Sequence, residues 1–271
     1  MRSSNRAGRG VKMYLLNSLA IAISMYSKIP VPNVEWNEKN MKYAMCFFPV
    51  VGAVIGIIQF LIGGFLLQYT DCGSLFFAVV MALIPVVITG GIHLDGYADT
   101  TDALSSYGEK EKKLEILKDP HTGAFAVIGL CVYFLADAAL WSEVTAEMLP
   151  VVSCMYVISR SLSGISVVSF QAAKNSGLLK TFQDGAQRLR VRIVLIFWLC
   201  ACAALMIFLS WQQAVGALLT AAAVFIYYYK MSMKQFGGTT GDLAGYFLQV
   251  CELAMLAGIL IGGLAGGTVM L

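Results

Sequence analysis

Charged residues are scarce in this chain, and no long polar stretch occurs anywhere along it. Asp, Glu, Lys and Arg make up 13% of the 271 residues, while hydrophobic residues make up 58%. A soluble domain carries about 25% charged residues, so this composition argues against an ordinary soluble protein and favours an integral membrane protein. Because no polar stretch is long enough to fold by itself, residues 1–271 are predicted to form a single integral membrane domain.

Several catalytic and metal-binding motifs are also missing. The seven cysteines form no Cys-x-x-Cys pair and nearly all lie in apolar runs, so we interpret them as small core residues. No Ser-His-Asp order, nucleophile elbow or Walker loop is visible, which argues against acyl transfer and nucleotide-driven pumping. We also see no internal repeat, and this argues against a transporter built from paired inverted halves.

Apolar stretches recur along the whole chain. Their approximate limits are 13–27, 44–68, 75–94, 124–141, 148–169, 193–211, 214–229 and 246–268. The first stretch is short for a bilayer and follows a basic N-terminus. It can be interpreted as a spanning helix, as an interfacial helix, or as a signal peptide with a small-residue site at Ala20-Ile21-Ala22.

The distribution of basic residues favours the interfacial helix. If stretch 13–27 does not span and the other seven do, the cytoplasmic segments hold 18 of the 19 lysines and arginines, and the remaining one, Arg160, lies within a span. These segments are 1–43, 95–123, 170–192 and 230–245, with 7, 4, 5 and 2 basic residues. We therefore predict an all-α polytopic bundle over residues 44–268 with about seven transmembrane helices. Residues 1–43 are predicted to be a cytoplasmic N-terminal segment that contains an interfacial helix.

Three carboxylates follow directly after an apolar stretch, in the segment from Gly90 to Asp102. Asp95, Asp99 and Asp102 are spaced by four and three residues, so a helix through this segment would place them on one face. Each acid would cost about 2.5–3.5 kcal/mol at a bilayer centre, and this cost predicts a compensating partner. Oxygen ligands without a nearby cysteine favour a hard ion such as Mg²⁺.

Two loop segments are predicted to lie at the same membrane face. Lys118, Asp119 and His121 come just before a span, where a phosphate-bearing substrate would lie, and helix-breaking residues there leave backbone amides available to an anion. Near the other end, the glycine-rich segment 236–245 contains Gly241 and Asp242, and such a loop allows close backbone approach to a phosphate.

Two charged residues are predicted to lie within spans. Arg160 needs an anionic partner, which is either a protein carboxylate or a substrate phosphate. Asp137 is one candidate partner for it. Glu252 is a functional-site candidate because it is a carboxylate inside an apolar helix, and an ion pair with Arg160 is the structural alternative. Grouped aspartates, a cation and phosphate-friendly positions together favour phosphoryl-group transfer.

The sequence resembles the cobalamin synthase family, also called adenosylcobinamide-GDP ribazoletransferase. The resemblance rests on the segment Gly90-Gly91-Ile92-His93-Leu94-Asp95-Gly96-Tyr97-Ala98-Asp99-Thr100-Thr101-Asp102 and on 114–123. Further matches are Lys28-Ile29-Pro30-Val31-Pro32, Phe48-Pro49-Val50-Val51-Gly52, Ser159-Arg160, Gly241-Asp242, Gly245 and Glu252. Three positions depart from the usual family pattern, namely Lys28, Ala103 and His121.

The resemblance implies the last assembly step of a cobamide coenzyme. In that reaction a hydroxyl of α-ribazole, or of its 5′-phosphate, attacks adenosylcobinamide-GDP and GMP leaves, with Mg²⁺ required. It also implies an integral protein of the bacterial cytoplasmic (inner) membrane whose active site faces the cytoplasm. No nucleic-acid partner is expected, and a homo-oligomer is an open alternative.

We assign hypothetical roles on this basis. The metal ligands would be Asp95, Asp99, Asp102, Asp242 and Glu252. The substrate-binding residues would be Lys28, Lys118, Asp119, His121, Arg160 and Gly241. The catalytic residues would be the three aspartates of segment 95–102 and His93, with one carboxylate or His93 accepting the proton of the attacking hydroxyl. The rival interpretations are a CDP-alcohol-type phosphotransferase and a membrane transporter of a cation or cobalamin precursor.

Overall fold

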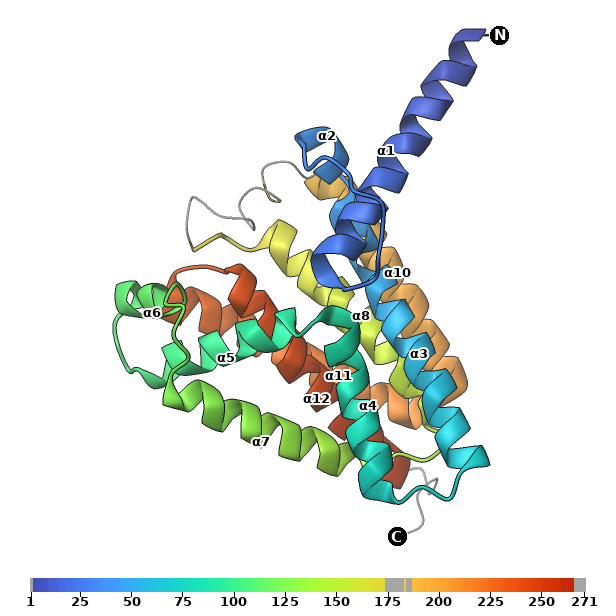
Figure 1. Ribbon diagram of the computed structural model, residues 1–271, viewed down its shortest axis with the longest axis vertical. Helices are drawn as coiled ribbons and strands as arrows, with labels where there is room; N and C mark the ends of the chain where they lie inside the picture. The colour runs from blue at the N-terminus through green and yellow to red at the C-terminus, as the bar shows by residue number, and fades with distance from the viewer. Residues whose placement is uncertain (1, 174–182, 184–186, 266–271) are drawn as a thin grey trace.

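The computed structural model describes residues 2–173, 183 and 187–265, and these residues form a helical bundle without a named strand (Figure 1). The N-terminal part contains α1 (Arg2–Tyr26), α2 (Glu38–Met41) and the 3₁₀ helix η1 (Ala44–Phe47). The following helices are α3 (Phe48–Tyr69), α4 (Ser74–Thr89), α5 (Ile92–Ser105), α6 (Lys110–Ile116) and α7 (Ala124–Trp141). The last ones are α8 (Leu149–Ser169), α10 (Arg188–Leu209), α11 (Trp211–Phe236) and α12 (Gly241–Ala265).

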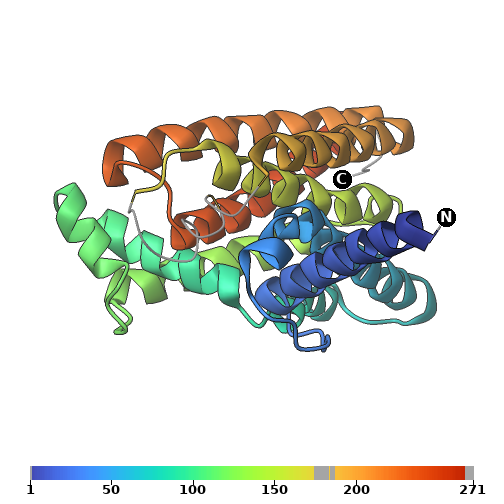
Figure 2. The same cartoon turned by 90° about the horizontal axis from the view of Figure 1, so that it is seen from above.

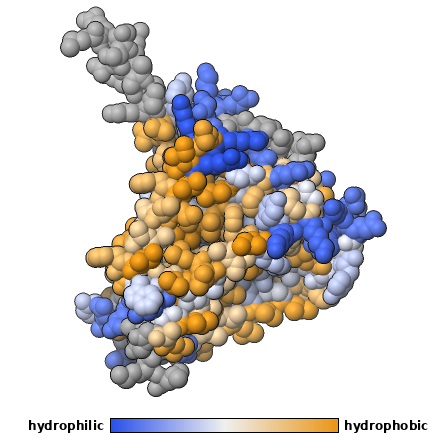
Figure 3. All heavy atoms as spheres, turned by 180° about the vertical axis from the view of Figure 1, so that it is seen from behind, coloured by the Kyte–Doolittle hydropathy of each residue, from blue (hydrophilic) through white to orange (hydrophobic). Residues whose placement is uncertain are grey.

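The predicted membrane architecture is confirmed. Within the described residues, six helical segments are long and apolar enough to cross a membrane, and there are seven if the bent pair α4–α5 counts as one span. The apolar part of α1, Met13–Tyr26, is shorter than a span, as the sequence indicated. Apolar side chains cover much of the middle of the molecule, and hydrophilic ones gather above it and at its edges (Figure 3).

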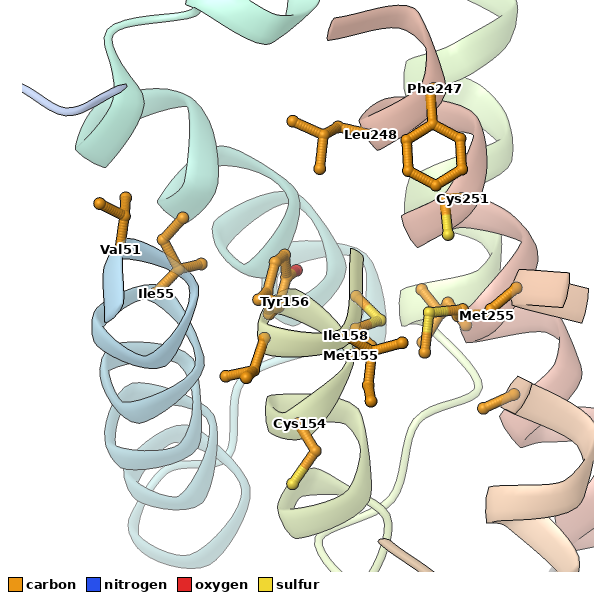
Figure 4. Packing of buried hydrophobic residues seen from close by; sticks show 14 of the residues in the cluster. Val51, Ile55, Cys154, Met155, Tyr156, Ile158, Phe247, Leu248, Cys251 and Met255 are labelled. Carbon is orange, nitrogen blue, oxygen red and sulfur yellow. The ribbon is translucent and has the colours of Figure 1, made fainter. Parts of the chain in front are cut away.

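Helix α8 forms the centre of the bundle, and it contacts α3, α10 and α12. Its buried side chains Tyr156 and Ile158 lie between Val51 on α3 and Met255 on α12 (Figure 4). Gly52 allows α3 to approach α8 closely, because a Cβ atom at this position would lie 2.6 Å from the carbonyl carbon of Tyr156. Small residues at such crossings are the usual means by which membrane helices pack closely.

A sharp turn separates α4 from α5. Gly90 and Gly91 have φ angles of 68° and 79°, a left-handed conformation that favours glycine, and the two helix axes differ by 98°. The Thr89 hydroxyl donates to the carbonyl oxygen of Pro85 and accepts from the amide of Gly91, which closes the end of α4. The predicted span 75–94 was therefore too long at its C-terminal end.

Helix α5 runs across the bundle next to α7 and α12, whereas α3 and α4 run steeply (Figure 1). The view from above shows α5 beside the start of α12 as well (Figure 2). The arrangement brings residues of segment 92–105 close to residues of segment 241–265. The candidate site lies where these two helices meet.

Candidate active site at the junction of α5 and α12

The three aspartates of α5 lie on its accessible side. Asp95 is exposed and both Asp99 and Asp102 are half-buried, whereas the opposite side of the helix buries Ala98 and Ala103. This pattern is the one that spacings of four and three residues produce on a helix. The sequence-predicted row of carboxylates is therefore present as a local feature of α5.

The first turn of α12 adds a fourth carboxylate to this row. A Cβ atom at Gly96 would lie 2.7 Å from the carbonyl oxygen of Asp242, so only glycine allows this contact between the helices. Asp99 experiences electrostatic repulsion from Asp95, Asp102 and Asp242. We call these four aspartates the acidic cluster; its members come from two helices about 140 residues apart in sequence.

The loop between α6 and α7 borders the acidic cluster through Gly123. A Cβ atom at this position would contact both carboxylate oxygens of Asp102, which shows how closely the loop approaches the cluster. Lys118, Asp119 and His121 are exposed in the same loop. The structure therefore places the candidates of this loop beside the site, on its solvent-accessible border.

Asp119 and His121 form a local pair within this loop. The Asp119 carboxylate accepts the backbone N–H of His121 at 3.0 Å and lies 2.7 Å from its Nδ1. These two hydrogen bonds, the backbone one first, lower the pKa of Asp119 below its usual value. The pair holds the loop in a turn, as Asp side chains commonly do.

Backbone contacts fix the glycine-rich segment that leads into α12. The amide of Thr239 donates to the carbonyl oxygen of Gln171 at 2.8 Å, and the amide of Ala173 donates to the carbonyl oxygen of Thr239 at 2.9 Å. The Thr240 hydroxyl then accepts the amide of Leu243 and caps the helix. Gly241 is exposed at this end. In the predicted basic segment 170–192, residues 174–182 and 184–186 lie outside the described residues, whereas Arg188, Arg190 and Arg192 form the start of α10.

Arg160 is not accessible to a substrate in this structure. Its side chain is 0% exposed, and its Nη1 donates to Glu252 Oε1 at 2.5 Å. Ser159 Oγ donates to the same carboxylate oxygen at 2.7 Å. The anionic partner of Arg160 is therefore Glu252 rather than Asp137 or a substrate phosphate. The geometry does not support Glu252 as a metal ligand or Arg160 as a phosphate-binding residue.

His93 lies away from the acidic cluster. It is 5% exposed and packs against the rings of Tyr26 and Phe48, on the buried side of α5. Residues two apart on a helix point in opposite directions, so His93 and Asp95 do not share a face. The geometry therefore does not support His93 as the acceptor of a substrate proton.

Lys28 lies at the turn between α4 and α5. Its amide donates to the carbonyl oxygen of Ile88 at 2.7 Å, and its exposed side chain packs against Gly90. The turn leads directly into the helix that carries the acidic cluster. A role of Lys28 in substrate binding stays a prediction.

Lys113 lies in a charged stretch on α6 but is buried, which the sequence analysis did not predict. Lys113 is 6% exposed, and its Nζ donates to Gln235 Oε1 at 2.5 Å. The partner lies near the C-terminal end of α11, where a cation is favoured by the helix dipole. The sequence around Lys113 does not indicate this contact, because it depends on how α6 packs against α11.

The acidic cluster does not form a complete metal site. Among the described residues, no group of three or more His, Cys, Asp or Glu side chains could hold a metal ion. The donor set is all oxygen, and Asp95, Asp99 and Asp102 form no ion pair with a described lysine or arginine. Mg²⁺ is usually held by one or two carboxylates together with substrate phosphates, so the cluster fits a magnesium ion that a diphosphate shares.

Together, these observations define a polytopic helical membrane protein whose acidic cluster lies between α5 and the first turn of α12. A model of the family described as cobalamin-5-phosphate synthase matches residues 18–260. The chain therefore belongs to the cobalamin-5-phosphate synthase family.

Curated relatives agree with this assignment. A protein of Lachnoclostridium phytofermentans named adenosylcobinamide-GDP ribazoletransferase is 49% identical over 251 residues, which cover 92% of this chain and 94% of the relative. Proteins of the same name from Clostridium botulinum and Treponema denticola are 33% and 32% identical, each over 89% of this chain and 96% of the relative. No solved structure matches the chain.

Proposed function

We propose that this protein is a membrane-embedded transferase that joins α-ribazole, or its 5′-phosphate, to adenosylcobinamide-GDP and releases GMP. The product is adenosylcobalamin or its 5′-phosphate, in the last assembly step of the coenzyme. Membership of the cobalamin-5-phosphate synthase family and the name of the relatives support this function. The single structural observation that carries the proposal is the gathering of Asp95, Asp99, Asp102 and Asp242 beside an exposed loop.

The reaction needs a site that binds a diphosphate and a group that accepts one proton. The acceptor hydroxyl oxygen forms a bond to the cobinamide-side phosphorus, and the bond from that phosphorus to the bridging oxygen breaks. GMP leaves with the bonding electrons, and a carboxylate of the acidic cluster takes the hydroxyl proton. Lys118, exposed in the loop that borders the cluster, supplies positive charge for the substrate phosphates.

A magnesium ion is part of this proposal. One or two carboxylates among Asp95, Asp99, Asp102 and Asp242 would hold it together with the substrate phosphates. Their oxygen donors and the repulsion of Asp99 by the other three support this assignment. When bound, the ion would neutralise charge on the diphosphate and its leaving group. The protein's own part is to hold the four carboxylates together from two helices.

We place the acidic cluster on the cytoplasmic side of a bacterial cytoplasmic membrane. The positive-inside rule supports this orientation, because segments 1–43, 95–123, 170–192 and 230–245 hold nearly all the basic residues. The orientation can be tested by labelling single cysteines introduced at Tyr107 and at Asp71, which are both exposed in the structure. A reagent that does not cross the membrane should label position 71 in intact cells and position 107 only after lysis.

The activity can be tested with purified protein in detergent or nanodiscs. We expect release of GMP from adenosylcobinamide-GDP when α-ribazole and Mg²⁺ are added, and loss of this release when the metal is chelated. Asp95→Asn and Asp99→Asn should each lower the rate at least about a hundredfold, the usual cost of losing an electrostatic contact in a transition state.

Asp71→Asn is the matched control, because Asp71 is exposed in the loop before α4, whereas the acidic cluster begins after the other end of that helix. It should keep the wild-type rate. Full activity of both cluster variants would remove these residues from the mechanism. Release of CMP from CDP-diacylglycerol and an alcohol, without GMP release in the first assay, would instead favour the CDP-alcohol-type phosphotransferase.

A further inference from the structure

A second group of polar side chains surrounds a small cavity in the middle of the bundle, separate from the acidic cluster. Helices α4, α5, α7, α8 and α12 all contribute to its wall. The polar side chains in this wall are Thr89, His93, Tyr133, Asp137, Tyr156, Arg160, Gln249 and Glu252. The cavity has room for roughly one or two water molecules.

Two of these side chains present hydrogen-bonding atoms that the described chain does not satisfy. Nε and Nη2 of Arg160 find no partner, although the side chain is 0% exposed and Nη1 is fully used. Nε2 of His93 also finds no partner, and His93 interacts electrostatically with Arg160. Buried polar atoms are nearly always hydrogen-bonded, so these atoms indicate an occupant of the cavity.

The chemistry of the wall identifies the class of this occupant. The guanidinium nitrogens of Arg160 can only donate, whereas the second nitrogen of a neutral imidazole can accept or donate according to its tautomer. An anion is not required, because Glu252 already compensates the charge of Arg160. Water is small enough, and it both accepts from an arginine and bonds to either form of a histidine.

We propose that ordered water occupies this cavity and links Arg160 to His93, and that Arg160, Glu252 and His93 are thereby positioning residues for the acidic cluster. The link would join three helices by polar contacts. His93 is on α5, two residues before Asp95, and Glu252 is on α12, ten residues after Asp242. Arg160 on α8 lines the same cavity as both and bonds directly to Glu252.

This arrangement fixes the relative position of the two helices that carry the acidic cluster. The ion pair holds α12 to α8, and the water holds α5 to the same arginine. The cluster works only if carboxylates from both helices reach one ligand, and a misplacement of 1 Å can cost about a hundredfold in rate. The inference rests on the proposed function for its kinetic part but not for the presence of water.

The first experiment is a high-resolution cryo-EM structure of the full chain in lipid nanodiscs without substrate. We expect one or two water-sized density peaks within hydrogen-bonding distance of Arg160 Nη2 and His93 Nε2. A cavity without such a peak, or one filled by a lipid chain or a repositioned side chain, would overturn the proposal. This result does not depend on the enzymatic activity, so it separates failure of the inference from failure of the proposed function.

The second experiment compares His93→Phe with His93→Gln. Phenylalanine suits the Tyr26 and Phe48 rings around this position but has no nitrogen, whereas glutamine keeps a hydrogen-bonding group near the site of Nε2. We expect His93→Phe to lower kcat for GMP release about tenfold with KM within twofold, and His93→Gln to keep kcat within threefold. Equal kcat losses in both variants, or none in either, would contradict a positioning role.

Discussion

Gly96 of α5 lies directly against the backbone of Asp242, the second residue of α12. A Cβ atom at Gly96 would be 2.7 Å from the Asp242 carbonyl oxygen and 2.9 Å from its Cα, both of which belong to the main chain. The contact explains how carboxylates from distant parts of the sequence share one cluster. Because main-chain atoms in a helix cannot move aside cheaply, the spacing of the two helices depends on the absence of a side chain here.

Gly96→Ala should therefore separate α5 from α12. We expect the rate of GMP release to fall at least about tenfold, since the added methyl group forces the backbones apart where the acidic cluster forms. Gly64→Ala is the matched control, because Gly64 is also helical and a Cβ atom there meets nothing within 4 Å. The control should keep full activity and gain about 0.5–1 kcal/mol in stability. Equal activity of the two variants would show that the contact does not set the geometry of the cluster.

Glu252→Gln should destabilise the bundle strongly. The substitution leaves the guanidinium of Arg160 buried without its carboxylate, and breaking such a pair costs about 3–5 kcal/mol. Equilibrium unfolding in mixed detergent micelles would measure this loss, with Glu143→Gln as the control at an exposed position. The double variant Arg160→Met/Glu252→Met should recover much of the lost stability, because it removes both charges. A double variant less stable than Glu252→Gln would show that the pair contributes more than charge compensation.

The turn formed by Asp119 and His121 should depend on pH. The pKa of Asp119 is lowered in the folded state, so the carboxylate favours the turn at pH values above its ordinary pKa of 3.8. This contribution is lost as the pH falls through the lowered folded value. Carbon-detected NMR of the Asp119 carboxyl group should give a midpoint below 3.8, and His121→Ala should raise it. An unchanged midpoint in the variant would contradict the pairing.

Lys118→Met should weaken substrate binding more than it slows the chemical step. Lys118 is exposed on the loop that Gly123 holds against Asp102, so its charge can serve the phosphates of a docked substrate. We expect KM for adenosylcobinamide-GDP to rise about fivefold to tenfold with kcat within twofold. This pattern results when a lost contact stabilised the bound substrate and the transition state equally. Lys112→Met, which removes an exposed lysine paired with Glu115, provides the comparison. Identical KM values in both variants would exclude a specific role for Lys118.

Local features of this fold could be predicted from the sequence. The apolar stretches and the basic residues gave seven spans, because length and charge decide membrane insertion almost independently of tertiary contacts. The row formed by Asp95, Asp99 and Asp102 also depends only on helical spacing. Both predictions succeed since they need no knowledge of how helices pack.

Features that depend on packing could not be predicted in the same way. Asp137 and Glu252 both lie mid-span, and only the arrangement of α7, α8 and α12 decides that Glu252 pairs with Arg160. The burial of Lys113 likewise depends on where α6 meets the end of α11. The apolar stretch continues to about residue 94 in the sequence, but the left-handed conformation of Gly90 and Gly91 ends α4 at Thr89.

The turn at Gly90 and Gly91 has a consequence for how such proteins can evolve. It divides this part of the chain into the apolar α4 and the carboxylate-bearing α5, so the two features are encoded in separate stretches of chain. Substitutions that reshape the acidic surface for a different acceptor therefore leave the hydrophobicity of the preceding helix untouched. Selection can therefore change the acidic surface after the two glycines without changing the apolar helix before them.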